Sequence, residues 1–275
     1  MKINSHEFFS RFIDNCDVSV SFDGFVVTDN TWRQTPPIPS PSSRLYYVTE
    51  GEGILISDTE TMKLKPGYVY IAPCGMQCGY YGTPSVSKLF FHVNVILPDG
   101  YDLFSTANSF ACIERPIEYI QKLTDWYLGD SAIEHVMLKA ELWKTVSEFA
   151  EILLEGDKRP TNYSNAVSNA ISYIRANLSA SLAVADVAEA SFCSAGTLSS
   201  AFKRELGLSV AKYIEDLLMF EARRMLLASE RSIFNISADL GFCDQFYFSR
   251  RFKKQFGLSP REYRKTYLSS LGLLP

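Results

Sequence analysis

Residues 245–259 read QFYFSRRFKKQFGLS, a stretch in which aromatic and basic side chains alternate almost without a neutral residue. From Phe248 onward every fourth residue is a phenylalanine, and at 100° per residue this spacing makes an apolar stripe along a helix. Arg250 and Lys254 fall on the opposite side of that helix. The pattern alone fits two interpretations, a solvated charged face and a cationic face that binds a negatively charged partner.

The flanking residues favour the second interpretation. Upstream, ISADLGFCD (236–244) predicts a short amphipathic helix that ends at Gly241, and Asp244 can cap the helix that follows. Downstream, Gly257 suits a helix C-cap, and the Ser-Pro pair at 259–260 suits the start of another helix. A short helix, a tight turn and a second helix with a basic outer face form the layout of a helix-turn-helix unit.

A second copy of this unit lies earlier in the chain. FKRELGLS (202–209) and FKKQFGLS (252–259) match at an offset of 50 residues, and Phe192 and Phe242 hold the same offset. The helix predicted between the copies, residues 210–229, would span ~30 Å at ~1.5 Å per residue. One turn of B-DNA is ~34 Å long, so this helix could present two recognition helices to successive turns of the major groove.

Charge is divided unevenly along the chain of 275 residues, whose formal net charge is −4. Residues 161–275 hold 14 basic and 10 acidic side chains, a balance of +4, whereas residues 1–160 hold 13 and 21, a balance of −8. This asymmetry indicates a basic binding module joined to an acidic partner domain.

Several classes of protein are disfavoured. The N-terminal segment MKINSHEFFSRFIDNCD contains acidic residues and no apolar core, so it does not resemble a signal peptide. No stretch approaches the ~18 apolar residues of a membrane span. The six cysteines show no C-x-x-C spacing, which favours small buried side chains over disulfides or a metal site. We therefore expect a cytoplasmic protein that does not bind a membrane.

The first third of the chain has the pattern of strands and turns. RLYYVTEGEGILISD (44–58) predicts two strands about a Glu-Gly-Glu-Gly turn, and residues 63–75 and 87–98 predict two more strands. Turn signals recur every 8–12 residues, which is typical of a small barrel or sandwich.

From Pro116 the apolar period becomes helical and predicts helices over 117–128 and 132–155. The longer helix carries an apolar stripe that could pack on the barrel, on its neighbour or on a second subunit. We favour self-association, and internal packing stays open. Residues 156–165 have no periodicity and predict a linker. The stripe consists of Ile133, Met137, Ala140, Trp143 (or Lys144), Val146, Phe149 and Leu153.

These motifs carry a family resemblance. ISADLGFCDQFYFSRRFKKQFGLSPREYRK (236–265) closely resembles the signature of the AraC/XylS family of bacterial transcription regulators. Residues 182–229 resemble the first helix-turn-helix unit and the linking helix of that family. More weakly, YYVTEGEG, LKPGYVYIAP and the FFHVNV strand look like its cupin-like effector domain. In one departure, Phe192 stands where the first turn usually has glycine.

The resemblance implies an α+β fold of two domains, an N-terminal cupin-like β-barrel followed by helices and a C-terminal all-α tandem helix-turn-helix. The expected divisions are a ligand-sensing domain over 1–115, a helical dimerisation or packing segment over 116–155, a linker over 156–165, and a DNA-binding domain over 166–275 with units at 182–209 and 233–259.

The second unit offers side chains that can recognise bases. Arg250 can donate two hydrogen bonds to guanine and Gln245 can pair with adenine. Phe246, beside Tyr247 on the outward face, suits a thymine methyl group. The phosphate backbone would be contacted by Arg251, Lys253 and Lys254.

The first unit presents smaller outward side chains, and no bidentate base reader is among them. We therefore predict that sequence discrimination rests mainly on the second unit. The candidate DNA contacts of the first unit are Thr197, Ser199, Ser200 and Lys203.

The N-terminal domain could be a metal enzyme or a sensor. Metal cupins need several histidines, and this chain has only His6, His92 and His135, with Cys78 where the family often has a further histidine. We expect no catalytic residue, no metal and no cofactor. Aromatic platforms with a few polar groups suit a sugar or another small polar metabolite, and a filled core without ligand stays open. The candidate ligand residues are Trp32, Arg33, Arg44, Tyr46, Tyr70, His92 and Asn94.

Two functional hypotheses follow. In the first, the protein is a homodimeric transcription regulator that binds double-stranded promoter DNA under control of a small-molecule effector, with RNA polymerase as a candidate partner. In the alternative, the N-terminal domain is a protein-interaction or oligomerisation module, and DNA binding is not gated by a ligand.

Overall fold

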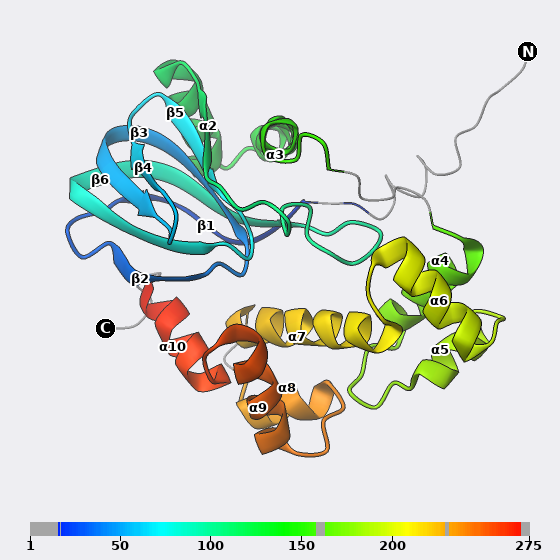
Figure 1. Ribbon diagram of the computed structural model, residues 1–275. Coiled ribbons are helices and arrows are strands. Elements are labelled where there is room, and N and C mark those ends of the chain that lie inside the picture. The colour runs from blue at the N-terminus through cyan, green and yellow to red at the C-terminus, as the bar shows by residue number, and fades with distance from the viewer. Residues whose placement is uncertain (1–15, 17, 158–162, 229–230, 271–275) are drawn as a thin grey trace, which may run out of the picture. The chain divides into compact units, whose positions relative to one another are not determined.

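The computed structural model describes residues 16, 18–157, 163–228 and 231–270 (Figure 1). The described residues form two compact units. The sheet unit holds those up to Asp157 except Pro98–Gly100, and the helical unit holds the others. Half of the predicted linker, 158–162, and the end of the predicted linking helix at 229 lie outside the described residues.

The sheet unit is built on an antiparallel sheet whose described strands run in the order β1-β6-β3-β5-β7, with β2 also pairing with β6 and β4 with β3. No pairing among the described strands joins β1 to β7, so hydrogen bonds do not close a barrel. A cupin-like jelly roll is compatible with this order. The strands are β1 (Val18–Val27), β2 (Arg33–Pro39), β3 (Ser43–Ile56), β4 (Thr61–Leu64), β5 (Tyr68–Ala72), β6 (Gln77–Val95) and β7 (Ala111–Glu114).

The predicted turn within residues 44–58 is wrong. β3 runs through the Glu-Gly-Glu-Gly segment as one strand, with irregular register beside Glu50 and Gly53. Gly51 has a φ of 72°, and a Cβ at this position would collide with the backbone oxygen of Ser85. The glycines therefore bulge the strand where it passes β6 instead of reversing it.

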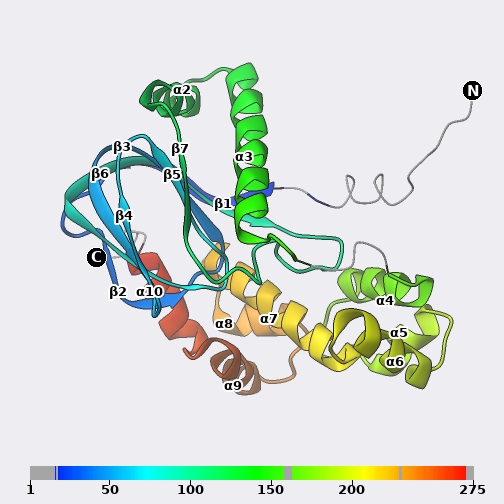
Figure 2. The same cartoon turned by 45° about the horizontal axis from the view of Figure 1, so that its top comes forward.

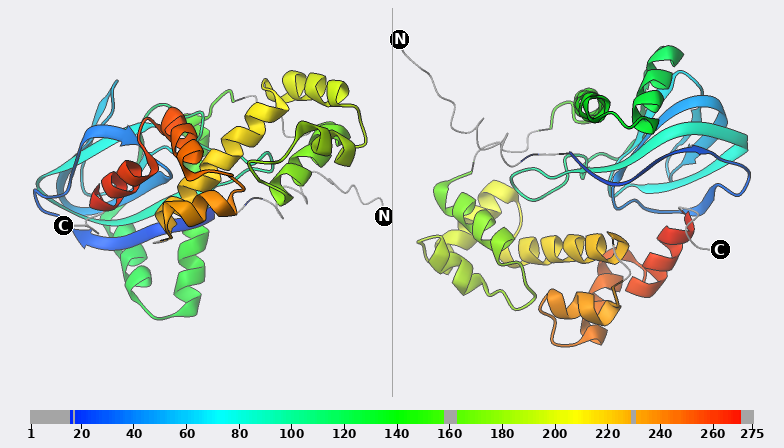
Figure 3. Two further views of the ribbon diagram at one scale, coloured as in Figure 1. Left: turned by 90° about the horizontal axis from the view of Figure 1, so that it is seen from below. Right: turned by 180° about the vertical axis from the view of Figure 1, so that it is seen from behind.

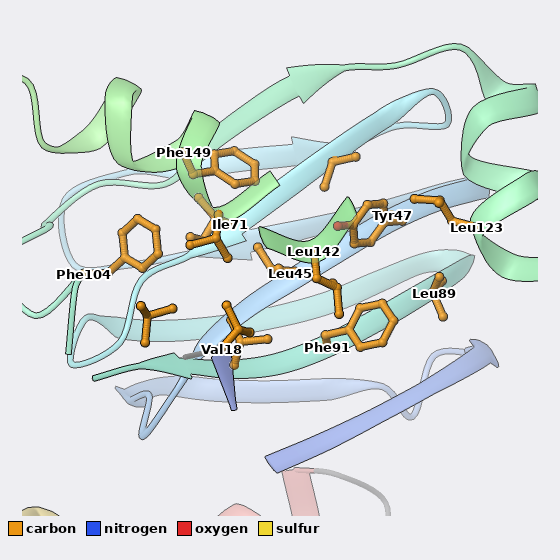
Figure 4. Packing of buried hydrophobic residues seen from close by; sticks show 14 of the residues in the cluster. Val18, Leu45, Tyr47, Ile71, Leu89, Phe91, Phe104, Leu123, Leu142 and Phe149 are labelled. Atoms are coloured by element: carbon orange, nitrogen blue, oxygen red, sulfur yellow. The ribbon is translucent and has the colours of Figure 1, made fainter. Parts of the chain in front are cut away.

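Two helices cover one face of this sheet (Figures 1 and 3). They are α2 (Ile117–Leu128) and α3 (Ala132–Leu153), close to the predicted bounds. Figure 4 shows strand residues such as Leu45 and Phe91 packed together with Leu142 and Phe149 of α3. The Tyr47 hydroxyl donates a hydrogen bond to Thr145 at 3.1 Å and so ties β3 to α3. This covered face is the apolar core of the unit.

The helical unit consists of two groups of short helices joined by one long helix, α7 (Val210–Ala228) (Figures 2 and 3). The predicted fold class, a sheet domain followed by helices and then a helical tandem helix-turn-helix, is confirmed. The first group is α4 (Asn165–Ala176), α5 (Val184–Ala190) and α6 (Ala195–Leu206), and the second is α8 (Ile233–Asp239), α9 (Gln245–Phe256) and α10 (Pro260–Ser270).

Candidate nucleic-acid interface and effector site

Helix α9 begins and ends at residues that the sequence marks. The Asp244 carboxylate accepts hydrogen bonds from the backbone N–H groups of Phe246 (3.0 Å) and Tyr247 (2.8 Å), which satisfies two otherwise unpaired donors. At the other end Gly257 takes a left-handed conformation with φ 78°. Phe252 is fully buried against the ring of Tyr263. Phe248 is also fully buried and packs on Phe252, so the predicted apolar stripe is confirmed.

The opposite face of α9 is open to solvent and positively charged. Phe246 is 73% exposed, an unusual position for a large apolar side chain. The guanidinium of Arg250 lies 5.8 Å from the centre of the Tyr247 ring, a cation–π contact that orients it on the outer face. Lys253 and Lys254 are exposed, and Gln245 is half-buried at the start of the helix.

Arg251 has a structural contact. Its guanidinium forms an ion pair with Glu215 of α7 at 3.0 Å and a hydrogen bond with the Tyr247 hydroxyl. These contacts brace the recognition helix against the linking helix. The sequence suggests Arg251 as a phosphate contact alongside the lysines, but the structure engages it internally.

Helix α6 of the first unit has the same arrangement with smaller side chains. The Ser194 hydroxyl caps it by accepting a hydrogen bond from Thr197 N–H at 3.1 Å. The Lys203 ammonium donates to the carbonyl of Gly207 at 3.0 Å and helps to cap the C-terminus. All four candidate DNA contacts of this helix, Thr197, Ser199, Ser200 and Lys203, are exposed.

The turns of the two helix-turn-helix units differ in length by one residue, although the helices after them keep an offset of 50. Cys193 N–H bonds to Ala188 O as Phe242 N–H bonds to Ser237 O, an offset of 49, so the second turn is one residue longer. The predicted match of Phe192 with Phe242 is therefore wrong. Phe192 occupies the left-handed position of Gly241 in the second turn.

Phe192, Gly241 and Phe242 lie in different environments. Phe192 has a φ of 55° and is 90% exposed, whereas Gly241 has a φ of 75° and Phe242 is buried. A left-handed conformation is unfavourable for a residue with a Cβ. The first turn thus accepts backbone strain and displays an aromatic ring to solvent.

In the sheet unit, the face opposite the helices carries ionisable side chains, and we call it the inner face. Register pairs Arg44 with His92 and Val48 with Lys88, so both pairs project to the same side. Arg44 is completely buried, Lys88 is 1% exposed and His92 is buried. Three buried basic side chains on one sheet face are a rare feature that demands a physical account.

The candidate ligand residues divide into two groups. Tyr46 and Tyr70 pair across β3 and β5 on the inner face with Arg44 and His92, and the half-buried Trp32 contacts Tyr46 edge-on at 6.1 Å between ring centres. The structure thus brings five of the seven together.

The other two lie elsewhere. Arg33 is exposed and donates to the Thr35 hydroxyl at 3.0 Å. The Asn94 amide donates to Asp102 at 3.0 Å and to the Pro41 carbonyl at 3.2 Å, which holds the end of β6 in place.

Sequence reasoning missed two residues of the inner face, Lys88 and Tyr80. The Lys88 ammonium lies 3.4 Å from the centre of the Trp32 ring and 5.2 Å from that of Tyr46. Tyr80 stacks on Trp32 at 4.6 Å between ring centres and faces the Arg44 guanidinium at 5.1 Å. The signal was present in SKLFFHVNV, because alternation in a strand puts Lys88 on the face of His92.

Burial controls the charges on this face. It lowers the pKa of Lys88 to about 7, and the positive charge of Arg44 lowers it further. Burial also holds the pKa of His92 well below its usual range, with Arg44 and Lys88 adding to the effect, so the imidazole is neutral at pH 7. Among the described residues, no group of three or more His, Cys, Asp or Glu side chains could hold a metal ion.

The two capped helix-turn-helix units, joined by one linking helix and with a cationic outer face on α9, define a DNA-binding transcription regulator. A family model described as a helix-turn-helix domain matches residues 187–266. The chain is 26% identical over 227 residues to the arabinose operon regulatory protein of Salmonella typhimurium, covering 78% of this chain and 80% of that protein. It is 24% identical over 266 residues to the Msm operon regulatory protein of Streptococcus mutans, covering 92% and 94%.

Among solved structures, an apo form of ToxT from Vibrio cholerae is similar at a TM-score of 0.49 and 13% identity, over 92% of this chain and 97% of that one. These similarities support the resemblance to AraC/XylS transcription regulators that the sequence motifs carry. None of the helices in the described part of the chain is both long enough and apolar enough to cross a bilayer.

Proposed function

We propose that the protein regulates transcription by binding promoter DNA through α6 and α9, under control of a small polar metabolite bound on the inner face of the sheet unit. The observation that carries the DNA-binding half is the exposed cationic surface of α9, fixed by the Asp244 cap and by Arg251. The proposed DNA contacts are Thr197, Ser199, Ser200, Lys203, Gln245, Phe246, Tyr247, Arg250, Lys253 and Lys254.

A sugar is the metabolite class that the relatives favour. One similar protein is named for the arabinose operon, and it matches this chain across most of its length. The rings of Trp32 and Tyr80 give this face the aromatic character that suits a sugar ring. The proposed ligand residues are Trp32, Arg44, Tyr46, Tyr70 and His92, whereas the contacts of Arg33 and Asn94 do not support a direct role.

A homodimer held by α3 is part of the proposal. Ile133, Val136 and Met137 share one side of this helix, and all three are exposed, the first at 73%. Apolar side chains grouped on an exposed helix face favour a protein partner. We also propose the domain divisions given above, a cytoplasmic location, no enzymatic activity, and RNA polymerase as a candidate partner of the DNA-bound form.

The same exposed face supports the alternative function. A sheet unit that only oligomerises would need the α3 surface and no ligand. In that case the inner face would be a filled core, and no metabolite would change DNA affinity.

Selection of binding sequences from a random duplex library by the full-length protein tests the proposal. We expect an enriched motif that spans two successive helical turns, and a thermal shift with at least one metabolite of a sugar panel, since a ligand that binds the folded state raises stability by RT ln(1+[L]/Kd). Failure to enrich any sequence at low salt would reject DNA recognition. An enriched motif whose affinity no metabolite alters would favour the alternative.

A further inference from the structure

We propose that the effector carries an anionic group, a carboxylate or a phosphate, and that Lys88 binds this group on the inner face of the sheet unit. This inference rests on the proposed ligand-sensing function and specifies the chemistry of its ligand.

Within the part of the chain that the structure describes, Lys88 has no counter-ion. The side chain is 1% exposed, and its ammonium has no hydrogen-bond acceptor among the described residues. No described carboxylate forms an ion pair with it either. Buried charges in proteins are ordinarily paired, because an ammonium without partners loses its hydration and gains nothing equivalent. A lysine so placed is costly unless a ligand completes its environment.

The ammonium faces aromatic rings and lies near another base. Trp32 lies 3.4 Å away and Tyr46 5.2 Å away, both measured to the ring centre. Ring faces attract a cation, but less strongly than an anion does. Arg44 lies close enough to disfavour a proton on Lys88, so the region has positive potential that rings alone do not cancel.

A ligand would reach Lys88 past Trp32. This indole is partly exposed, whereas Tyr46 and Tyr80 on either side of it are buried. It rests against Gly53, where a Cβ would lie 3.2 Å from Trp32 Cζ3, and a side chain there would crowd the ring. If the indole moves, a ligand anion can take its place beside the ammonium. The indole would still offer an aromatic surface to the rest of the ligand.

The ligand class follows from these neighbours. A compact anionic group would bind the Lys88 ammonium, and a ring-shaped or apolar body would stack on Trp32. A sugar acid and a sugar phosphate share this chemistry.

A first experiment needs no knowledge of the natural effector. The full-length wild type, Lys88→Met and the exposed control Lys63→Met are melted in chloride, acetate or inorganic phosphate at equal ionic strength. We expect acetate or phosphate to raise the Tm of wild type and of Lys63→Met by more than that of Lys88→Met, because these anions also stabilise folded proteins without binding a site. Stabilisation by acetate points to a carboxylate ligand and stabilisation by phosphate to a phosphorylated one. Equal responses of all three proteins would overturn the proposal.

A second experiment separates this inference from the proposed function. Matched series of hexoses, hexuronates and hexose 6-phosphates are titrated against wild type, Lys88→Met and Lys88→Arg. We expect an anionic member to bind wild type, to bind Lys88→Met about a hundredfold more weakly, and to keep part of its affinity for Lys88→Arg. A neutral hexose that binds wild type and Lys88→Met equally would reject the anionic site and leave the sensing function intact. Unchanged DNA binding by Lys88→Met shows that the variant is folded.

Discussion

Burying the Lys88 ammonium costs the ligand-free protein stability, because among the described residues the faces of aromatic rings replace its hydration and no hydrogen-bond acceptor does. The substitution Lys88→Met is therefore expected to raise the free energy of unfolding by about 1–4 kcal/mol at pH 7. Denaturant titration of the full-length proteins measures the difference. A variant less stable than wild type would contradict the interpretation of Lys88 as an uncompensated charge.

The stability difference between these two proteins should also depend on pH. Burial, and then Arg44, lowers the pKa of Lys88 from 10.5 to about 7 in the folded protein. The unfolded chain then binds this proton more tightly, so the stability of wild type rises as pH increases from about 7 toward 10.5. The advantage of Lys88→Met shrinks over the same interval.

The titratable groups beside Lys88 do not interfere with the comparison over this pH interval. Burial lowers the pKa of His92 and raises those of Cys78 and Tyr46 in the folded protein, and the titration of these groups is common to both proteins, so it cancels from the difference between them. Denaturation at pH 7, 8 and 9 measures the slope, and a difference between the two proteins that stays constant would show that Lys88 is not the titrating group.

Arg250 and Lys254 lie on the same exposed face of α9 but have different expected roles. Replacing Arg250 by alanine should cost about 1–3 kcal/mol on the preferred sequence and reduce discrimination at one base pair. Replacing Lys254 by alanine should weaken all sequences alike and lower the slope of log affinity against log salt by about one. Fluorescence anisotropy on matched and mismatched duplexes distinguishes them. Identical effects of both substitutions would contradict base recognition by Arg250.

At the scale of elements, the turns of the two helix-turn-helix units allow a matched pair of substitutions whose expected effects on stability have opposite signs. Phe192→Asn should stabilise the helical unit by about 0.5–1 kcal/mol, because asparagine tolerates the left-handed conformation better than phenylalanine. Gly241→Ala should destabilise it by more than about 1 kcal/mol, since the added Cβ strains the backbone and collides with the Ser179 hydroxyl.

Calorimetry of the full-length variants measures both effects. Destabilisation by Phe192→Asn would mean that the phenylalanine ring contributes contacts that outweigh its backbone strain. A DNA-binding assay on the same variant reports whether the exposed ring contributes to function.

Local signals explain which elements could be predicted. The caps Asp244 and Gly257 bond within a few residues of themselves, so the sequence alone was enough to place α9. β3 was divided wrongly, because glycine marks both turns and bulges and only its partner strand decides between them. The one-residue difference between the two turns was hidden because the helices after them keep an offset of 50.

At the scale of the whole molecule, the exposed side of α3 makes a testable claim about assembly. Val136→Glu should convert the proposed dimer to a monomer, because a carboxylate cannot be buried in an apolar interface without a partner. The exposed control Lys122→Glu on α2 makes a charge change of the same sign away from that face. Light scattering coupled to size-exclusion chromatography measures the mass. A mass unaffected by Val136→Glu would remove α3 from the interface.

The candidate effector site was harder to predict than the DNA-binding surface for a physical reason. Residues of α9 share a face through helical periodicity, which can be followed in the sequence. Arg44 and Lys88 come together only through the register of β3 on β6, across more than forty positions of chain. Arg33 adjoins Trp32 in sequence yet is exposed and bonds to Thr35, so adjacency in sequence does not place it on the inner face.

The linking helix α7 joins two helix-turn-helix units of unequal chemistry, and in the proposed DNA complex this gives the bound chain a head and a tail on the double helix. A protomer bound in this way has a polarity that its target must share, so the target need not be a palindrome. Inverting the target relative to the start of transcription would leave affinity unchanged and reverse which recognition helix lies nearer the polymerase. The rate of transcription from such a promoter would then depend on the orientation of the target sequence.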